Sequence, residues 1–260
     1  MTDLIKQHIE KLLENSKRED GRALDEYRQP VSVEYGVSAK SAEGSARVKI
    51  GETEVIAGVK LDLGEPFPDT PDEGTIIVNA ELIPLSSPDF ESGPPSIDSI
   101  EISRVVDRGI RESKTLDFKK LCITEGEKMW MVFIDIYPIN DSGNLFDACA
   151  LAALAALKDA KFPAYNKTEA KIDYTKKTTK GLPLADTPIS ITVGKINDKF
   201  IIDPTHEEEQ AIDSRLTLAI NERDEICAAQ KGGEEPLSIE EIDQIADLVI
   251  KKSKELRKKL

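Results

Sequence analysis

Strands and helices follow one another twice in the same order along this chain of 260 residues, and this order constrains the fold most. In the first part, segments that alternate apolar and polar residues with a period of two precede two helical segments. After residue 186, a second set of short strands again leads into a helix. The pattern therefore predicts an α+β fold made of two similar βα lobes.

The first lobe is expected to contain five strands and two helices. The strands are expected at residues 31–37, 44–50, 53–63, 75–82 and 129–136. One helix spans residues 96–115 and has Ser96 as its candidate N-cap. The other helix, residues 148–157, is rich in alanine, and such small side chains suit close packing against a sheet.

The second lobe is expected to contain four strands and a closing helix. The strands are expected at residues 189–193, 200–202, 216–220 and 225–230. The helix opens with a capping box formed by Ser238 and Glu241. Residues 161–183 are polar and rich in lysine, so we expect a connection there. The predicted divisions are an N-terminal helix with its linker, a first lobe, a connection and a second lobe, at residues 1–27, 28–160, 161–186 and 187–260.

The charge of the chain limits how it can bind nucleic acid. The net charge is -14, whereas phosphate contacts need Lys and Arg. Any RNA-binding charge must therefore be concentrated locally or supplied by a partner. No apolar stretch approaches the roughly 18 residues of a membrane span, so no membrane partner is expected. The three cysteines are widely spaced, which favours buried free thiols in a reducing cytoplasm.

An acidic run after the strand at residues 200–202 resembles half of a metal site. It extends from Asp203 to Glu209, and carboxylate oxygens are the donors that Mg²⁺ prefers. The next outward-facing candidate is Arg215, whose guanidinium cannot ligate a metal. The sequence thus combines the frame of a metal-assisted site with an inverted charge.

Several short motifs occur together, in an order that covers nearly the whole chain. They are Arg18-Glu19-Asp20-Gly21-Arg22 with Asp25 and Arg28, Gly44-Ser45-Ala46, the segment from Ser103 to Arg111, Asp141-Ser142-Gly143-Asn144, and Asp203-Pro204-Thr205 with Glu207-Glu208-Glu209. In this combination the chain resembles the RNase PH family, and within it the non-catalytic ring subunits of the archaeal exosome.

The resemblance carries expectations about fold and partners. It implies two lobes of the ribosomal-protein-S5-domain-2-like type and a ring of three heterodimers with a catalytic RNase-PH-like subunit. It also implies RNA-binding cap subunits and single-stranded RNA as partners, a role in 3′-to-5′ RNA degradation and processing, and no cofactor of the chain's own.

The resemblance also allows a test of the catalytic site. Phosphorolysis of RNA needs a bound phosphate, which active members hold at a glycine-rich turn followed by Thr and Arg at a helix N-terminus. The matching residues here are Ser142, Gly143, Asn144 and Leu145. Leucine stands where the arginine is expected, so a charge-assisted contact to the anion would be lost. The segment is predicted to be a degenerate phosphate site.

The expected metal site departs from the family pattern as well. Aligning Asp203 with the family's strand-end aspartate puts Glu209 near the first catalytic position and Arg215 near the second. A positive charge a few ångströms from a magnesium site is repulsive by several kcal/mol at an effective dielectric constant of about 20. We therefore predict a degenerate metal site, no bound metal and no catalytic residue.

Three arginines on the helix at residues 96–115 are candidates for RNA binding. Arg104, Arg108 and Arg111 fall on one stripe at 100° per residue, opposite apolar residues that would pack on the sheet. In the family that the chain resembles, this helix faces the central channel, which favours contacts with the RNA backbone. The alternative is a solvated face whose arginines pair with neighbouring carboxylates.

The residues of the acidic run also allow two other functions. One is an active, phosphate- and Mg-dependent 3′-to-5′ exoribonuclease that uses Asp203, Glu207 and Glu209. The other is a metal-dependent hydrolase unrelated to RNA, built around His206. The single tryptophan, Trp130, is expected to fill a core rather than to stack on a base.

Overall fold

The larger of two main sheets belongs to the first lobe. The computed structural model describes residues 2–166 and 171–260. The strands are β1 (Val31–Tyr35), β2 (Gly44–Ile50), β3 (Thr53–Gly64), β4 (Thr75–Ala80), β5 (Cys122–Thr124) and β6 (Lys128–Asn140). Their order is β1-β2-β3-β6-β4, with β5 also paired to β6. All pairs are antiparallel except β4 with β6.

The second lobe contains the smaller main sheet. Its strands are β9 (Ile189–Ile196), β10 (Lys199–Ile202), β11 (Ser214–Ile220) and β12 (Ile226–Gly233). Their order is β10-β9-β11-β12, and each pair is antiparallel. The strand β10 matters for function, because its C-terminal end leads into the acidic run.

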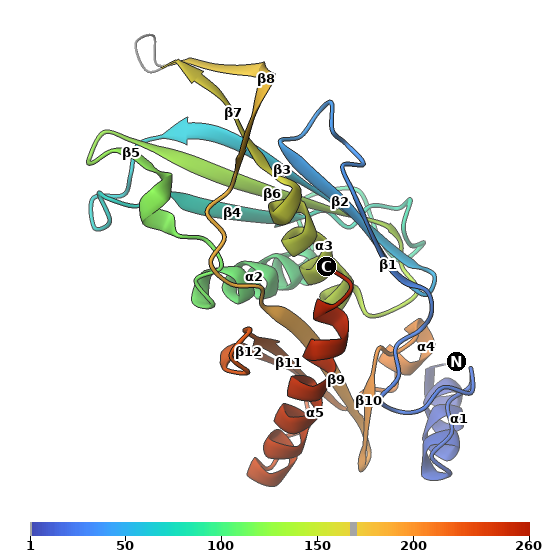
Figure 1. Ribbon diagram of the computed structural model, residues 1–260. Helices are drawn as coiled ribbons and strands as arrows, with labels where there is room; N and C mark the ends of the chain where they lie inside the picture. The colour runs from blue at the N-terminus through green and yellow to red at the C-terminus, as the bar shows by residue number, and fades with distance from the viewer. Residues whose placement is uncertain (1, 167–170) are drawn as a thin grey trace.

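Two helices lie between the sheets, as Figure 1 shows. These are α2 (Ile97–Glu112) and α3 (Leu145–Asp159), and both contact the large sheet as well as β9. Helix α5 (Ile239–Arg257) packs on β9 and β11, and α1 (Thr2–Glu14) packs on the short helix α4 (His206–Glu209). A 3-10 turn, η1 (Phe118–Leu121), precedes β5. The layers are sheet, helices, sheet and helix.

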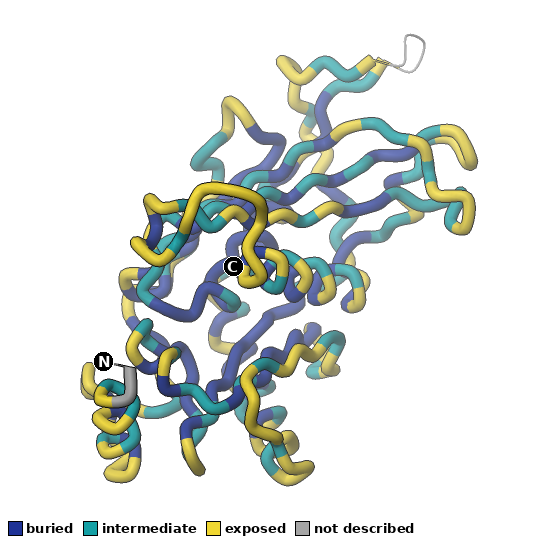
Figure 2. The backbone as a smooth tube through the Cα atoms, turned by 180° about the vertical axis from the view of Figure 1, so that it is seen from behind, coloured by how far each residue is buried: buried dark blue, intermediate teal, exposed yellow. Residues whose placement is uncertain are grey.

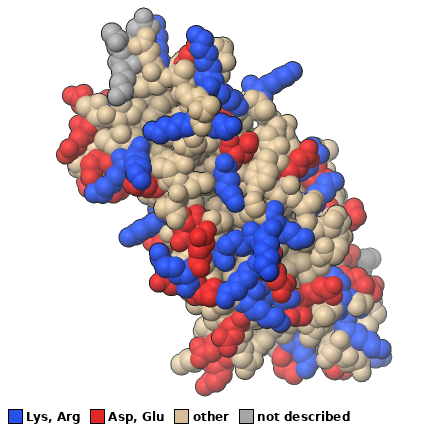
Figure 3. All heavy atoms as spheres, viewed as in Figure 1, with Lys and Arg blue, Asp and Glu red and all other residues tan. Residues whose placement is uncertain are grey.

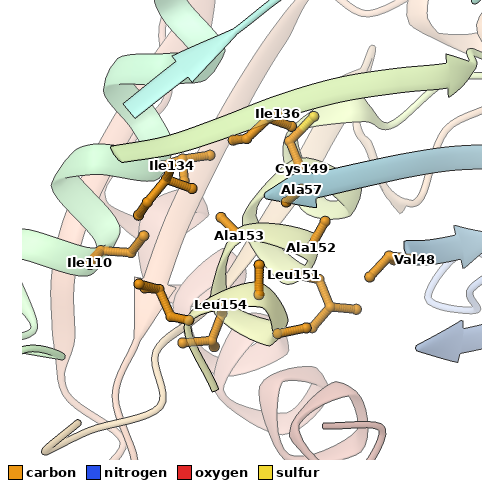
Figure 4. Close-up of a cluster of buried hydrophobic side chains, with 14 of the residues drawn as sticks. Val48, Ala57, Ile110, Ile134, Ile136, Cys149, Leu151, Ala152, Ala153 and Leu154 are labelled. Carbon is orange, nitrogen blue, oxygen red and sulfur yellow. The ribbon is translucent and has the colours of Figure 1, made fainter. Parts of the chain in front are cut away.

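Helix α3 is buried on nearly every side because its residues are mostly alanine and leucine. Figure 4 shows side chains of this helix among residues of β2, β3, β6 and α2. A Cβ atom added to Gly44 on β2 would lie 2.4 Å from the carbonyl oxygen of Ala156, so strand and helix touch at this point. In Figure 2 the buried backbone runs through the middle of the molecule, where α3 lies. The helix therefore holds the two lobes around one core.

Most of the expected elements occur where the sequence places them. The α+β fold is confirmed, Ser96 caps α2, and Ser238 and Glu241 form the capping box of α5. Trp130 is 7% exposed and packs against Phe162 and Tyr165, as a core residue does. Among the described residues, no helix is long and apolar enough to cross a membrane.

The lysine-rich connection and the cysteines differ from expectation. Residues 161–183 contain two paired strands, β7 (Lys161–Asn166) and β8 (Lys171–Gly181). Most of β8 is exposed, so it has no apolar alternation by which a strand is recognised. All three cysteines are free, but only Cys149 is buried, while the other two are partly exposed.

Candidate functional site

Asp203, the first residue of the acidic run, lies in a buried cluster of arginines. Its side chain is inaccessible to solvent, and its backbone has a positive φ of 50°. Arg28 donates from Nε to Oδ2 at 2.9 Å and from Nη2 to Oδ1 at 2.7 Å, and its backbone N–H donates to Oδ2 at 2.7 Å. Arg22 and the amide of Asn144 also donate to this carboxylate. The oxygens of Asp203 are thus committed to internal partners.

Arg18 fixes the segment that follows Asp203. Its guanidinium is fully buried and donates to the backbone carbonyls of Ile202 and Asp203, each at 2.8 Å. It also forms a two-point contact with the carboxylate of Glu208. Glu208 in turn accepts from the backbone N–H of Thr205 and so closes a capping box. The N-terminal arginine motif therefore joins the linker to the second lobe, a role that sequence reasoning missed.

The glycine turn before α3 is held from its carbonyl side. Arg28 donates to the carbonyl oxygens of Ser142 and Gly143, and Thr53 donates to that of Gly143 at 2.7 Å. Gly143 has φ of 97°, and a Cβ atom there would lie 2.5 Å from the carbonyl oxygen of Pro204. Only glycine fits this approach between the turn and the acidic run.

Internal carboxylates occupy the N–H side of the same turn. The N–H of Gly143 donates to Asp141 Oδ1 at 2.9 Å, and the N–H of Asn144 donates to Glu209 Oε1 at 2.8 Å. Such donors at a helix N-terminus are suited to an anion. Here the protein supplies the anion itself. Leu145, where an arginine was expected in an active site, is buried in the core and offers no donor.

Burial raises the pKa of Glu209 to about 7, from an ordinary value of 4.5. The N–H of Asn144 opposes this rise by stabilising the ionised form, and the nearby charge of Asp141 adds to it. Near neutral pH, Glu209 is therefore close to its midpoint of titration. The carboxyl can act as an acceptor for Asn144 in either protonation state.

Glu209 and Arg215 line the same cavity of about 470 Å³, whereas Asp203 does not. Arg215 donates to Glu101 at 2.5 Å, and its guanidinium carbon lies 4.4 Å from the centroid of the Phe146 ring. The position expected to carry the second carboxylate thus carries a paired guanidinium. His206 also lines this cavity; its Nε2 lies 3.5 Å from Asp89, and the residue begins α4.

The described residues do not form a cluster of metal ligands. In the described part of the chain, no group of three or more His, Cys, Asp or Glu side chains is arranged to hold one. Of the carboxylates considered, Asp203 is bound to arginines, Glu209 accepts from the turn, and Glu207 points to an exposed position. Asp203 and Glu209 both accept from Asn144, but they do not form a metal-binding group with Glu207.

The arginines of α2 differ in how many internal ion pairs and hydrogen bonds they form. Arg111 is paired with Asp107 at 2.8 Å and also donates to the carbonyl oxygen of Ile76. Arg108 lies 3.4 Å from Glu112, with both side chains about half exposed. Arg104 is exposed and has no hydrogen bond or ion pair to any described residue. The paired-arginine alternative thus describes Arg111 best and Arg104 least.

Arg104 and Arg108 line a second cavity of about 250 Å³. It lies between α2 and the small sheet, where Ser190, Thr217 and Gln230 add polar groups. The apolar side of α2 is buried, as its periodicity predicts. The helix therefore presents two arginines beside hydroxyl and amide groups.

A further group of cations gathers over the last turns of α5 (Figure 3). Most of these have internal partners: Lys252 pairs with Asp25 at 3.2 Å and Lys254 with Asp224 at 2.6 Å. Arg257 donates to the backbone carbonyls of Thr187, before β9, and of Ile220 and Asn221, at the end of β11. The basic end of α5 thus has a structural explanation.

Comparison with known families identifies the fold. The model of the 3′ exoribonuclease family, domain 1, matches residues 27–163, and that of domain 2 matches residues 186–251. The chain belongs to the RNase PH family. Both lobes are therefore of the RNase PH type, as the order of motifs predicted.

Relatives within the RNase PH family are similar over their full length. The chain is 44% identical to the exosome complex component Rrp42 of Methanothermobacter thermautotrophicus, over 98% of this chain and 93% of the relative. It is 46% identical to the Rrp42 of Archaeoglobus fulgidus, over 100% and 96%.

Solved structures of archaeal exosomes contain chains with the same fold. An Archaeoglobus fulgidus exosome with RNA bound to the active site contains a chain that superposes with a TM-score of 0.91 at 46% identity, covering 99% of this chain and 98% of that one. An archaeal exosome core gives 0.87 at 42% identity, covering 99% and 96%. Rice Rrp46, at 20% identity, 93% and 97% coverage and a TM-score of 0.69, supports the fold alone.

Proposed function

We propose that this chain is a non-catalytic ring subunit of an exosome, in which it pairs with a catalytic RNase-PH-like subunit. One observation carries the proposal: the carboxylate of Glu209 accepts the N–H of Asn144, at the turn where a phosphate would have to bind. An incoming phosphate would meet an acidic group there, and Leu145 offers it no donor. The similarity to exosome components over the full length supports the same role.

The chain serves 3′-to-5′ RNA degradation and processing indirectly. By pairing with its sister in a ring of three heterodimers, it helps to shape the sister's active site. The same ring carries RNA-binding cap subunits and admits single-stranded RNA, and it works in the cytoplasm. This role needs no cofactor on this chain.

In this proposal the arginines of α2 contribute to the RNA path. Arg104 and Arg108 are exposed next to a polar cavity. Arg111 adds a third positive charge on the same stripe and is paired with Asp107. Guanidinium groups bind phosphate through several donors at once, which suits the backbone of RNA. On a chain with a net charge of -14, this stripe is a local exception.

Product release tests the proposal. The purified chain is incubated with single-stranded RNA, inorganic phosphate and Mg²⁺, and nucleoside diphosphates are separated by chromatography. We expect no product from this chain and steady release once the catalytic sister is added. Nucleoside diphosphate formed by the chain alone, at a rate that depends on Asp203 or Glu209, would contradict the proposal.

A further inference from the structure

The β7–β8 hairpin is a local concentration of positive charge. The sequence from residue 161 to residue 181 contains six lysines against two carboxylates, whereas the whole chain has a net charge of -14. Figure 1 shows the two strands projecting from the large sheet, at the end of the molecule away from α5. Figure 3 shows cationic side chains over this part of the surface.

The described part of the hairpin is anchored to the body. The Nζ of Lys177 donates to the backbone carbonyls of Ala39 and Ala42, and Thr178 donates to the carbonyl of Phe162. Phe162 and Tyr165 pack on the buried Trp130. The strands thus present their outward side chains in a fixed arrangement.

Most of the remaining lysines have no strong internal partner. Lys161 and Lys171 are exposed, and neither side chain has an ion pair or hydrogen bond to a described residue. Lys176 lies 3.4 Å from Asp173 but is 77% exposed, so water screens the pair. Lys180 approaches only the ring of Phe162, with 5.3 Å from Nζ to the centroid. These four cations are available to an external anion.

A tyrosine on the strand that carries three of these lysines is partly open to solvent. Tyr174 is 45% exposed, and its hydroxyl donates to the carbonyl oxygen of Leu61 at 3.1 Å. The Nζ of Lys60 lies 4.7 Å from the ring centroid, so a cation adjoins the ring. A fixed, partly open ring can stack a base on the side away from Lys60, while lysines of the same hairpin bind phosphates of the strand.

We infer that the lysine hairpin, defined as Lys161, Lys171, Tyr174, Lys176 and Lys180, binds single-stranded RNA at a surface separate from the α2 arginines. The inference rests on the proposed function only for the choice of RNA as the ligand. Lysines act on phosphates as point charges without base specificity, and the open tyrosine ring favours a nucleic acid over an acidic protein surface. The hairpin thus holds RNA by its backbone.

The test measures RNA affinity with charge removed from the hairpin. The full-length chain is titrated with a fluorescein-labelled oligoadenylate, and anisotropy is followed at several salt concentrations. The variant combines Lys161→Gln, Lys171→Gln and Lys176→Gln. A matched control removes three other exposed lysines by Lys119→Gln, Lys258→Gln and Lys259→Gln. Circular dichroism checks that both variants are folded.

We expect the hairpin variant to bind RNA more weakly than the control. The slope of log affinity against log salt should fall in magnitude by about 2, since each phosphate contact on a single strand contributes about 0.7. Tyr174→Ala should weaken binding about 5-fold or more with little change in slope, and Tyr174→Phe should retain the affinity because the ring is kept.

Equal affinity and slope for the hairpin variant and the control would overturn the inference, and so would the absence of RNA binding by the wild-type chain at low salt. A hairpin variant that binds RNA normally but no longer enters the assembled complex would also overturn it, and would identify a protein partner instead. Product release tests the proposed function separately, so either idea can fail while the other holds.

Discussion

Replacing Glu209 by glutamine should reveal the cost of keeping an anion at the glycine turn. The pKa of Glu209 is raised to about 7 in the folded protein, whereas its ordinary value is 4.5. Between these values the folded protein binds more protons than the unfolded chain, so the free energy of unfolding falls as pH rises. The difference of about 2.5 units corresponds to roughly 3 kcal/mol at full effect. Above pH 7 the wild type bears this cost.

The Glu209→Gln variant removes the titration but keeps an oxygen that accepts from the N–H of Asn144. We expect the variant to match the wild type near pH 4.5 and to be more stable by roughly 3 kcal/mol near pH 8. Asp147, whose pKa burial also raises to about 7, contributes to both profiles equally and cancels in the difference.

Urea unfolding followed by the fluorescence of Trp130 measures these stabilities, because this single tryptophan is buried in the core. The exposed neighbour provides a control, and Glu207→Gln should not reproduce the gain in stability at pH 8. If Glu209→Gln and the wild type differ by the same amount at pH 4.5 and pH 8, Glu209 does not titrate as described. The account of the turn would then be refuted.

Three other variants test the remaining parts of the site. Arg28→Met should lower the free energy of unfolding by about 3–5 kcal/mol in urea, because it leaves a buried carboxylate without its main cation; a loss below 1 kcal/mol would contradict this. Gly143→Ala should destabilise the protein more than Gly126→Ala, since both have positive φ but only the former would meet backbone atoms, and equal thermal shifts would argue against the close approach. Arg104→Gln should weaken RNA binding and reduce the salt slope by about 0.7, more than Arg111→Gln does, because the latter arginine is already paired; anisotropy titrations in which the order is reversed would contradict the assignment.

The sequence by itself determined the elements and the family. Helix caps such as Ser96 and Ser238 depend on residues three positions away, and strand alternation depends on the nearest neighbours, so both can be read locally. The small residues of α3 also predicted a helix buried against a sheet. The order of the motifs identified the RNase PH family, which the family models confirm. The division of the chain at residues 27, 160 and 186 stays a prediction.

Only the tertiary structure decided which charges meet. Asn144 and Glu209 are 65 residues apart, and Arg28 and Asp203 are 175 apart, so nothing local pairs them. The sequence grouped Asp203 with Glu209 because they are close along the chain, yet the fold turns the former toward the arginines and the latter toward the glycine turn. Electrostatic interactions act through space and depend on burial, whereas a sequence gives only charges and their order.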